Sequence, residues 1–271
     1  MSRVAVAGLG LIGGSIALAS GALGYDRDAG ARERARRRGI ETADSLADAV
    51  AGADLVVTAV PTAATPELLR EVSALAPDAI LTDTASLKQP IVAAAQALRE
   101  GARFVAGHPM AGARGHGFEA ASPDIFRGRP WALVRTARSD DAAIAGVSAF
   151  VASLGARPVL LDAERHDRAM TWVSHLPHAV ASALARATAA GGGGDLAGLA
   201  GPGLLGATRL AGQPVPLGLE LALADPAALA RAIDAVSAEL AGLSEALRRG
   251  DEEVLRGLYE EAAAIRRSFE P

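Results

Sequence analysis

The spacing of three glycines near the N-terminus constrains the fold of this chain more than any other feature. Gly8, Gly10 and Gly13 follow the apolar run at residues 4–7 and precede another apolar segment at residues 15–19. In a turn from a strand into a helix, the first glycine permits the tight turn, the second lets phosphates approach the backbone, and the third allows close packing. The helix N-terminus that follows attracts anions. The segment therefore predicts a strand-turn-helix unit that binds the pyrophosphate of a dinucleotide.

An acidic residue follows where such a unit contacts a ribose. Asp26 ends the β-rich segment at residues 22–26, and its carboxylate can accept hydrogen bonds from ribose hydroxyls while it repels a 2′-phosphate. We therefore predict NAD as the cofactor rather than NADP, although the adjacent Arg27 offers a guanidinium that could bind a phosphate. Asp26 comes 13 residues after Gly13, against about 20 in the usual pattern, so we expect the first helix to be about one turn short.

A second apolar run leads to further candidate cofactor contacts. Val60 and Pro61 lie at the carboxyl end of the segment at residues 55–60, and ligands of open α/β sheets lie at the carboxyl ends of strands. A proline that merely ends the strand is the alternative. The predicted cofactor-contacting residues are Gly8, Leu9, Gly10, Leu11, Ile12, Gly13, Asp26, Arg27, Val60 and Pro61.

Short apolar segments alternate with amphipathic helical segments through about the first 160 residues. This alternation predicts an α/β fold, a Rossmann-type doubly wound parallel sheet. The predicted strands are residues 4–8, 22–26, 55–60, 79–83, 104–107, 131–134 and 158–161, and the clearest connecting helices are residues 31–38, 66–75 and 91–99.

Strand patterns stop after Asp162, and the remainder reads as helix. The predicted helices are residues 165–190, 227–249 and 252–269, with the glycine run at residues 191–194 as a flexible turn. We predict a dinucleotide-binding domain at residues 1–162 and an all-helical substrate and dimerisation domain at residues 163–271. Long apolar stripes on small-residue helices, residues 227–241 especially, predict a homodimer.

Composition narrows the partners of the chain. The net charge of −4 argues against a nucleic-acid surface, and the absence of cysteine excludes thiolate chemistry and disulfides. No segment reaches the roughly 18 uncharged apolar residues of a membrane span. Residues 4–23 could pass for a secretory signal, but the glycine spacing favours the nucleotide turn, so we expect a cytoplasmic protein with a small-molecule partner.

Three polar segments carry candidate chemistry. Residues 82–88 (TDTASLK) and 107–112 (GHPMAG) each leave a predicted strand, and residues 174–178 (SHLPH) lie on a predicted helix. His108 lies between Gly107 and Pro109 at a strand end, and a neutral imidazole there suits a general base near neutral pH. Ser86 could equally cap a helix. We expect Lys88 at the surface or at a helix start.

His175 and His178 are three residues apart, so they share one face of a helix. Such a pair can bind a metal or form a polar patch in a core. We expect no metal, because the surrounding sequence shows no supporting Asp or Glu ligand pattern.

HPMAG with a later glycine, the DxxSxK turn, SHLPH and the ATR sequence at residues 207–209 together resemble the prephenate and arogenate dehydrogenases, in order and spacing, over nearly the whole chain. The resemblance implies oxidative decarboxylation of prephenate to 4-hydroxyphenylpyruvate in tyrosine biosynthesis. It implies that His108 accepts the proton of the substrate hydroxyl and that Ser86 hydrogen-bonds the same hydroxyl. It also implies that His178 contacts the substrate side chain and that Arg209 pairs with a substrate carboxylate. We predict His175 as a further residue of the substrate site.

Several positions depart from the family pattern. Gly206 replaces a usual acid, Gly218 an aromatic residue, and Ala113 and Arg114 a polar or acidic pair. The choice between prephenate and arogenate, or a dual-specificity cyclohexadienyl dehydrogenase, therefore stays open. Hydroxy-acid dehydrogenases and pyrroline carboxylate reductases share the glycine turn but lack HPMAG followed by SHLPH. A non-catalytic nucleotide-sensing protein is the alternative from another class.

Overall fold

The computed structural model describes residues 3–113, 115, 117–191 and 196–269. Arg114 and residues 192–194 of the glycine run lie outside this range. The chain divides into two compact units, Met1–Ala169 and Met170–Pro271. The first unit includes helix α7 (Ala163–Met170) up to Ala169, whereas the boundary expected from the sequence lies at the start of that helix.

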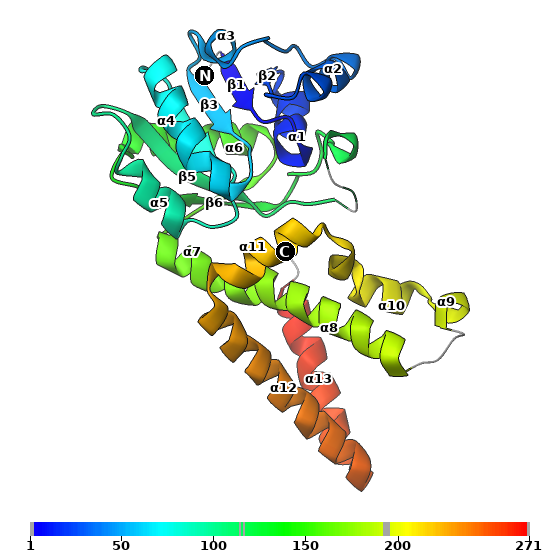
Figure 1. Cartoon of the computed structure of the whole chain (residues 1–271). Coiled ribbons are helices and arrows are strands. Elements are labelled where there is room, and N and C mark those ends of the chain that lie inside the picture. Colours follow the sequence, from blue (N-terminus) through cyan, green and yellow to red (C-terminus); the bar gives the residue numbers. More distant parts are fainter. Residues whose placement is uncertain (1–2, 114, 116, 192–195, 270–271) are drawn as a thin grey trace. The chain divides into compact units, whose positions relative to one another are not determined.

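Within the described residues, the first unit contains a seven-stranded sheet in the order β2-β1-β3-β4-β5-β6-β7 (Figure 1). Each strand overlaps one of the segments predicted from apolar runs, with ends that differ by at most two residues, because buried strands of such sheets are apolar on both faces. The strands are β1 (Val4–Ala7), β2 (Leu23–Tyr25), β3 (Leu55–Thr58), β4 (Ile80–Asp83), β5 (Arg103–Pro109), β6 (Pro130–Val134) and β7 (Arg157–Leu161).

The predicted doubly wound parallel sheet is confirmed, with one antiparallel pair of strands that the sequence did not indicate. β6 pairs antiparallel with β5, with His108 opposite Ala132, whereas β7 pairs parallel with β6. A parallel neighbour needs a crossover of a dozen or more residues, usually helical. In the described part of the β5–β6 connection the only helical element is the single 3-10 turn η2 (Phe118–Ala120), and α6 (Asp141–Ser153) supplies the crossover from β6 to β7.

Helices cover both faces of this sheet because its strands alternate their buried side chains. Val56 joins the apolar cluster under α3, α4 and α5, and Leu55 and Val57 join the cluster under α1 and α6. The helices of this unit not yet given are α1 (Leu11–Ser20), α2 (Ala29–Arg37), α3 (Leu46–Val50), α4 (Thr65–Leu75) and α5 (Gln89–Ala95), with the 3-10 turn η1 (Thr62–Ala64).

Two helix lengths bear on the sequence predictions. α1 has 10 residues, in keeping with the short spacing from Gly13 to Asp26. α5 ends at Ala95, before the predicted end at residue 99, because the chain tightens there: Ala97 N donates to Ala94 O and Leu98 N to Ala95 O.

The second unit is helical throughout its described residues, as predicted. The expected continuous helix at residues 165–190 is instead interrupted by a π-helical turn, η3 (Thr171–His175), which precedes α8. The long helices α12 and α13 lie antiparallel (Figure 1). The remaining elements are α8 (Leu176–Gly191), α9 (Leu196–Leu199), α10 (Pro202–Ala207), η4 (Arg209–Gly212), α11 (Val215–Ala224), α12 (Pro226–Arg249) and α13 (Glu252–Ser268). No helix in the described ranges is long and apolar enough to cross a membrane.

Candidate active site

The glycine turn after β1 has the geometry of a phosphate-binding turn. Gly8 has φ of 103°, and a Cβ there would overlap the carbonyl oxygen of Ala59. A Cβ at Gly13 would overlap the carbonyl oxygen of Gly8, so neither position accepts a side chain. Gly10, the N-cap of α1, differs because a Cβ there would meet no protein atom within 4 Å, and no side chain caps the helix. The open space at Gly10, beside uncapped N–H groups, fits a pyrophosphate.

Asp26 is anchored to this turn through both carboxylate oxygens. Oδ2 accepts a hydrogen bond from Leu9 N at 2.8 Å, and Oδ1 accepts one from Asp28 N at 2.9 Å. A carboxylate held this way at the end of β2 stands where a ribose is bound in such units. Arg27 is exposed beside it.

The end of β3 also reaches the glycine turn. A Cβ at Gly8 would come within 2.9 Å of Val60 Cγ1, which places Val60 against the turn. Pro61 is exposed and is the N-cap of the 3-10 turn η1, so it also ends the strand segment, as the alternative interpretation holds. The carboxyl ends of β1, β2 and β3 thus gather the predicted cofactor residues, and these residues fit NAD.

His108, half-buried near the end of β5, contacts a histidine that the sequence analysis did not single out. Its Nδ1 lies 2.9 Å from Nε2 of His166, and the two rings meet edge to face with centroids 5.1 Å apart. His166, on α7, is completely buried. Nδ1 of His166 lies 2.6 Å from Oδ1 of Asp167. The three side chains form a continuous chain of polar contacts that ends at His108.

Of the two places expected for Lys88, the helix start is right, since Lys88 is the N-cap of α5, and the surface is wrong, since its side chain is completely buried. Its Nζ donates to Oδ2 of Asp83 at 2.6 Å and to the carbonyl oxygen of Gly107 at 2.5 Å. Burial lowers the pKa of the Lys88 ammonium, and the Asp83 carboxylate opposes that shift. The apolar stem of lysine makes such burial possible, and the buried charge is tolerated because it is paired and hydrogen-bonded.

This ion pair fixes the backbone next to His108. Asp83 Oδ1 accepts from Gly107 N at 2.9 Å, while Lys88 donates to the carbonyl of the same residue. A Cβ at Gly107 would lie 2.6 Å from the carbonyl oxygen of Asp83, so no other residue fits without a shift. The peptide groups on both sides of Gly107 are therefore held before the chain reaches His108.

Ser86 does not cap a helix, so this alternative for Ser86 is wrong. It is half-buried in a bend, and α5 begins later, at Gln89 with Lys88 as the N-cap. The cap comes from a distant residue: Asp167 accepts hydrogen bonds from Lys88 N and Gln89 N, each at 2.8 Å. A contact between Ser86 and the substrate hydroxyl stays a prediction.

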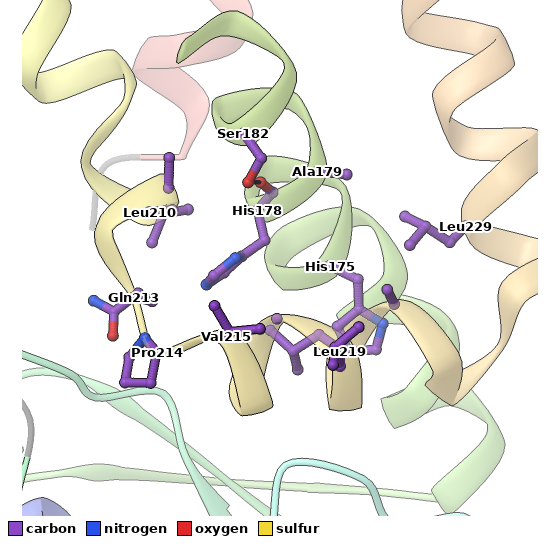
Figure 2. A pocket seen from close by; sticks show the side chains of 14 residues that line it. His175, His178, Ala179, Ser182, Leu210, Gln213, Pro214, Val215, Leu219 and Leu229 are labelled. Carbon is purple, nitrogen blue, oxygen red and sulfur yellow. Dashed lines mark hydrogen bonds between the residues drawn. The ribbon is translucent and has the colours of Figure 1, made fainter. Parts of the chain in front are cut away.

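The second unit holds its own pocket, of about 330 Å³. His175 and His178 both line it, and the imidazole of His178 points into the space between Leu210 and Val215 (Figure 2). Apolar side chains make up most of the wall, with Ser182 and Gln213 as further polar residues. This composition suits a small organic ligand fixed by a few polar groups.

Arg209 lies at the start of η4 and is exposed. Burial lowers the pKa of His178, and the positive charge of Arg209 lowers it further. The guanidinium charge of Arg209 therefore acts on the imidazole of His178. Of the positions that depart from the family pattern, Gly218 lines the pocket, and a Cβ at Gly206 would meet no atom within 4 Å.

Sequence reasoning missed Asp83, His166 and Asp167 as parts of the site. One signal was available: His166 is the only histidine in the sequence followed directly by an acid. Its partner, however, lies 58 residues away in the chain. Among the residues described, no cluster of three or more His, Asp or Glu side chains could hold a metal ion.

The fold and the glycine turn define an NAD-dependent dehydrogenase with a Rossmann-type unit and a helical unit. The family described as prephenate dehydrogenase, nucleotide-binding domain, matches residues 19–160, and prephenate dehydrogenase, dimerization domain, matches residues 162–261. The chain belongs to the prephenate dehydrogenase family.

Curated relatives carry related names. The chain is 30% identical over its full length to a prephenate dehydrogenase of Lactococcus lactis subsp. cremoris, of which it spans 78%. It is 34% identical, over 66% of its length, to a cyclohexadienyl dehydrogenase of Zymomonas mobilis, of which it spans 64%. It is also 34% identical, over 68% of its length, to a prephenate dehydrogenase of Bacillus subtilis, of which it spans 53%.

Solved structures agree in fold. A prephenate dehydrogenase from A. aeolicus in complex with hydroxyphenyl propionate and NAD+ superposes with a TM-score of 0.86 at 28% identity, covering 100% of this chain and 99% of that one. A Synechocystis arogenate dehydrogenase superposes with a TM-score of 0.80 at 28% identity, covering 99% of this chain and 100% of that one.

Alanine at the second and third glycines of the turn should have separable effects. Gly10→Ala should leave Tm close to that of the wild type, since its Cβ meets no protein atom, but should weaken NAD binding about tenfold, ~1.4 kcal/mol, by filling the pyrophosphate space. Gly13→Ala should lower both Tm and the affinity for NAD, because its Cβ overlaps the carbonyl oxygen of Gly8. Calorimetry and thermal unfolding of both variants measure this. Wild-type NAD affinity in Gly10→Ala would show that the pyrophosphate does not pass Gly10.

Removing the charge of Arg209 should raise the pKa of His178. Arg209→Ala takes away a positive charge that disfavours the imidazolium, so the pKa should move upward, and less so at high salt. NMR titration of the histidine ring protons gives the pKa directly. Arg186→Ala, at an exposed arginine further along α8, is the matched control. An unchanged or lowered pKa in Arg209→Ala would contradict the electrostatic coupling.

Proposed function

We propose that this protein is a prephenate dehydrogenase that converts prephenate to 4-hydroxyphenylpyruvate with NAD as hydride acceptor, in tyrosine biosynthesis. The observation that carries the proposal is His108, held at a strand end by a buried ion pair and a second histidine, in a chain of the prephenate dehydrogenase family. The names of the Lactococcus and Bacillus relatives, and the ligands of the A. aeolicus structure, support this assignment.

His108 is the proposed general base. The substrate hydroxyl must lose its proton as its carbon becomes a carbonyl, and an imidazole accepts a proton readily near neutral pH. Bound NAD supplies the nicotinamide carbon that accepts the hydride from the same substrate carbon. The new carbonyl then draws the electron pair of the ring–carboxylate bond into the ring, carbon dioxide leaves, and the ring becomes aromatic. Ser86, half-buried in the bend before α5, is proposed to hold the hydroxyl toward His108.

His178, His175 and Arg209 are the proposed substrate-binding residues of the second unit. A planar guanidinium can pair with a carboxylate through two parallel hydrogen bonds, so Arg209 is assigned to a substrate carboxylate. The lowered pKa of His178 favours a neutral imidazole, which can donate a hydrogen bond to a keto or carboxylate oxygen.

The pocket of the second unit, which His175 and His178 line, supports prephenate over arogenate as the substrate. These substrates differ in their side chain, which is an α-keto acid in prephenate and carries an ammonium group in arogenate. None of the described residues that line the pocket of His175 and His178 is Asp or Glu, so none of them offers a carboxylate to pair with an ammonium. Arogenate dehydrogenase or dual specificity is the second candidate, because the Zymomonas relative is named a cyclohexadienyl dehydrogenase and the Synechocystis structure an arogenate dehydrogenase.

Steady-state kinetics with each substrate and cofactor test the assignment. We expect kcat/KM to be highest for prephenate with NAD, and the product to be 4-hydroxyphenylpyruvate with one carbon dioxide released per NADH formed. A higher kcat/KM for arogenate would transfer the assignment to the second candidate. Absence of turnover with both substrates would reject the proposed function.

Loss of the base should affect the chemical step alone. His108→Asn should lower kcat by roughly two to four orders of magnitude, because general base catalysis contributes about that much, while the Kd for NAD stays near the wild-type value. Kinetics and NAD titration of the variant give both quantities. A variant that kept a third of the wild-type kcat would show that His108 is not the base.

We also propose that residues 1–162 and 163–271 are the two functional domains, with the second forming a homodimer, and that the protein works in the cytoplasm, where NAD is available. The family matches, which meet near residue 161, support the division, and the description of the second as a dimerization domain supports the dimer. On α12, Ile233, Leu240 and Leu247 lie seven residues apart on one face and are 39%, 60% and 59% exposed. An apolar stripe of this kind marks a protein–protein interface.

Light scattering at micromolar concentration should give the mass of a dimer. Leu240→Glu should shift the population toward monomer, because a charge in an apolar interface must be desolvated without a partner. Leu75→Glu, at an exposed leucine of α4 in the first unit, is the matched control and should remain dimeric. A monomeric wild-type protein would reject the dimer.

A further inference from the structure

We propose that His166, oriented by Asp167, is a positioning residue that sets the tautomer of His108, so that Nε2 of His108 carries the lone pair that accepts the substrate proton. This inference rests on the proposed function, since it specifies which ring nitrogen of the proposed base accepts the substrate proton. The observation behind it is the unbroken chain of contacts from Asp167 through His166 to Nδ1 of His108.

Asp167 begins the chain as an acceptor. Its Oδ1 and Oδ2 accept hydrogen bonds from Lys88 N and Gln89 N, at the N-terminus of α5. Desolvation by burial alone would raise the pKa of Asp167, but the hydrogen bonds from His166 and from the two backbone groups outweigh it and hold that pKa below its ordinary value. An ionised carboxylate can only accept hydrogen bonds, so Nδ1 of His166 must carry the proton that lies 2.6 Å from Oδ1.

His166 passes this constraint on to His108. A neutral imidazole with its proton on Nδ1 has a lone pair on Nε2, which here lies 2.9 Å from Nδ1 of His108. The hydrogen between the two rings must then come from His108. A neutral His108 with its proton on Nδ1 has its lone pair on Nε2, the nitrogen turned away from His166.

The arrangement matters because an unconstrained imidazole populates both tautomers, and only the form with a bare Nε2 can act as a base at that nitrogen. When His108 takes up the substrate proton, its Nδ1–H bond to His166 becomes charge-assisted and stabilises the imidazolium. The other charged groups brought toward His108 by these contacts are Lys88 and Asp83, which neutralise each other on Gly107. The carboxylate of Asp167, reached through His166, favours protonated His108.

The tautomer can be read directly by NMR. The chain has five histidines, so two-bond proton–nitrogen correlation spectra of the full-length protein labelled with ¹⁵N-histidine contain five ring systems. The signals missing in His108→Asn identify His108. Above the pH at which His108 loses its charge, we expect a protonated Nδ1 and an unprotonated Nε2. A wild-type His108 with its proton on Nε2 would overturn the inference, whether or not the protein turns over prephenate.

Variants of His166 separate positioning from structure. His166→Phe keeps an aromatic ring in the buried space but offers no acceptor, whereas the side-chain carbonyl of His166→Gln can accept from Nδ1 of His108. We expect His166→Phe to shift His108 toward the Nε2–H tautomer and to lower kcat about tenfold to a thousandfold, with KM and the Kd for NAD within about twofold of wild type. His166→Gln should restore part of both properties.

The pH dependence of kcat/KM in His166→Phe is a further test, because a purely structural role of His166 would leave it unchanged. Without the acceptor at His166, protonated His108 loses stabilisation, its pKa falls, and the acid limb of kcat/KM should move to lower pH. A structural role would lower Tm or the folded fraction and leave tautomer and acid limb unchanged, and that result would overturn the inference. If His166→Phe does not fold, the wild-type tautomer alone decides.

Discussion

The buried ion pair between Lys88 and Asp83 is the interaction on which the geometry of the first unit's site depends. Removing two charges from water costs several kcal/mol per ion, and a well-packed apolar pair of similar volume would often be as stable. Both partners, however, also bond the backbone of Gly107, one at its N–H and one at its carbonyl. The pair therefore does what an apolar pair could not, because it fixes the chain position from which His108 projects.

A second set of contacts holds the same region from the other side. Asp167 caps α5 at Lys88 and Gln89, and its neighbour His166 meets His108. The segment from residue 83 to residue 89 is thus held at its start by the Asp83 carboxylate and at its end by the Asp167 carboxylate. Ser86 lies midway in it. His108, the proposed base, and Ser86, the proposed hydroxyl partner, are therefore positioned by one connected polar network rather than by two independent loops. Networks of this kind stabilise a unique arrangement only when all their members are bonded.

Local sequence was sufficient for the strands and insufficient for this network, for physical reasons. Strands buried on both faces are apolar runs, so all seven could be located, but a run does not encode its direction, and the reversal at β6 was missed. Lysine is almost never fully buried, so Lys88 was expected at the surface or at a helix start, and its burial was not foreseen. Its burial depends on Gly107, 19 residues away, as the role of His166 depends on a partner 58 residues away. Glycine spacing and the HPMAG and SHLPH motifs could be read because their chemistry is local.

The two units differ in how they are stabilised, and this difference bears on assembly. In the first unit a sheet is covered by helices on both faces, with two large apolar clusters. In the second, the described cluster of buried apolar residues contains Leu176, Leu229 and Ala232, while leucines further along α12 stay exposed. Helices gain most of their stability from burying an apolar face rather than from propensity. If the proposed homodimer covers these leucines, folding of the long helices and pairing with a second copy are expected to be thermodynamically linked.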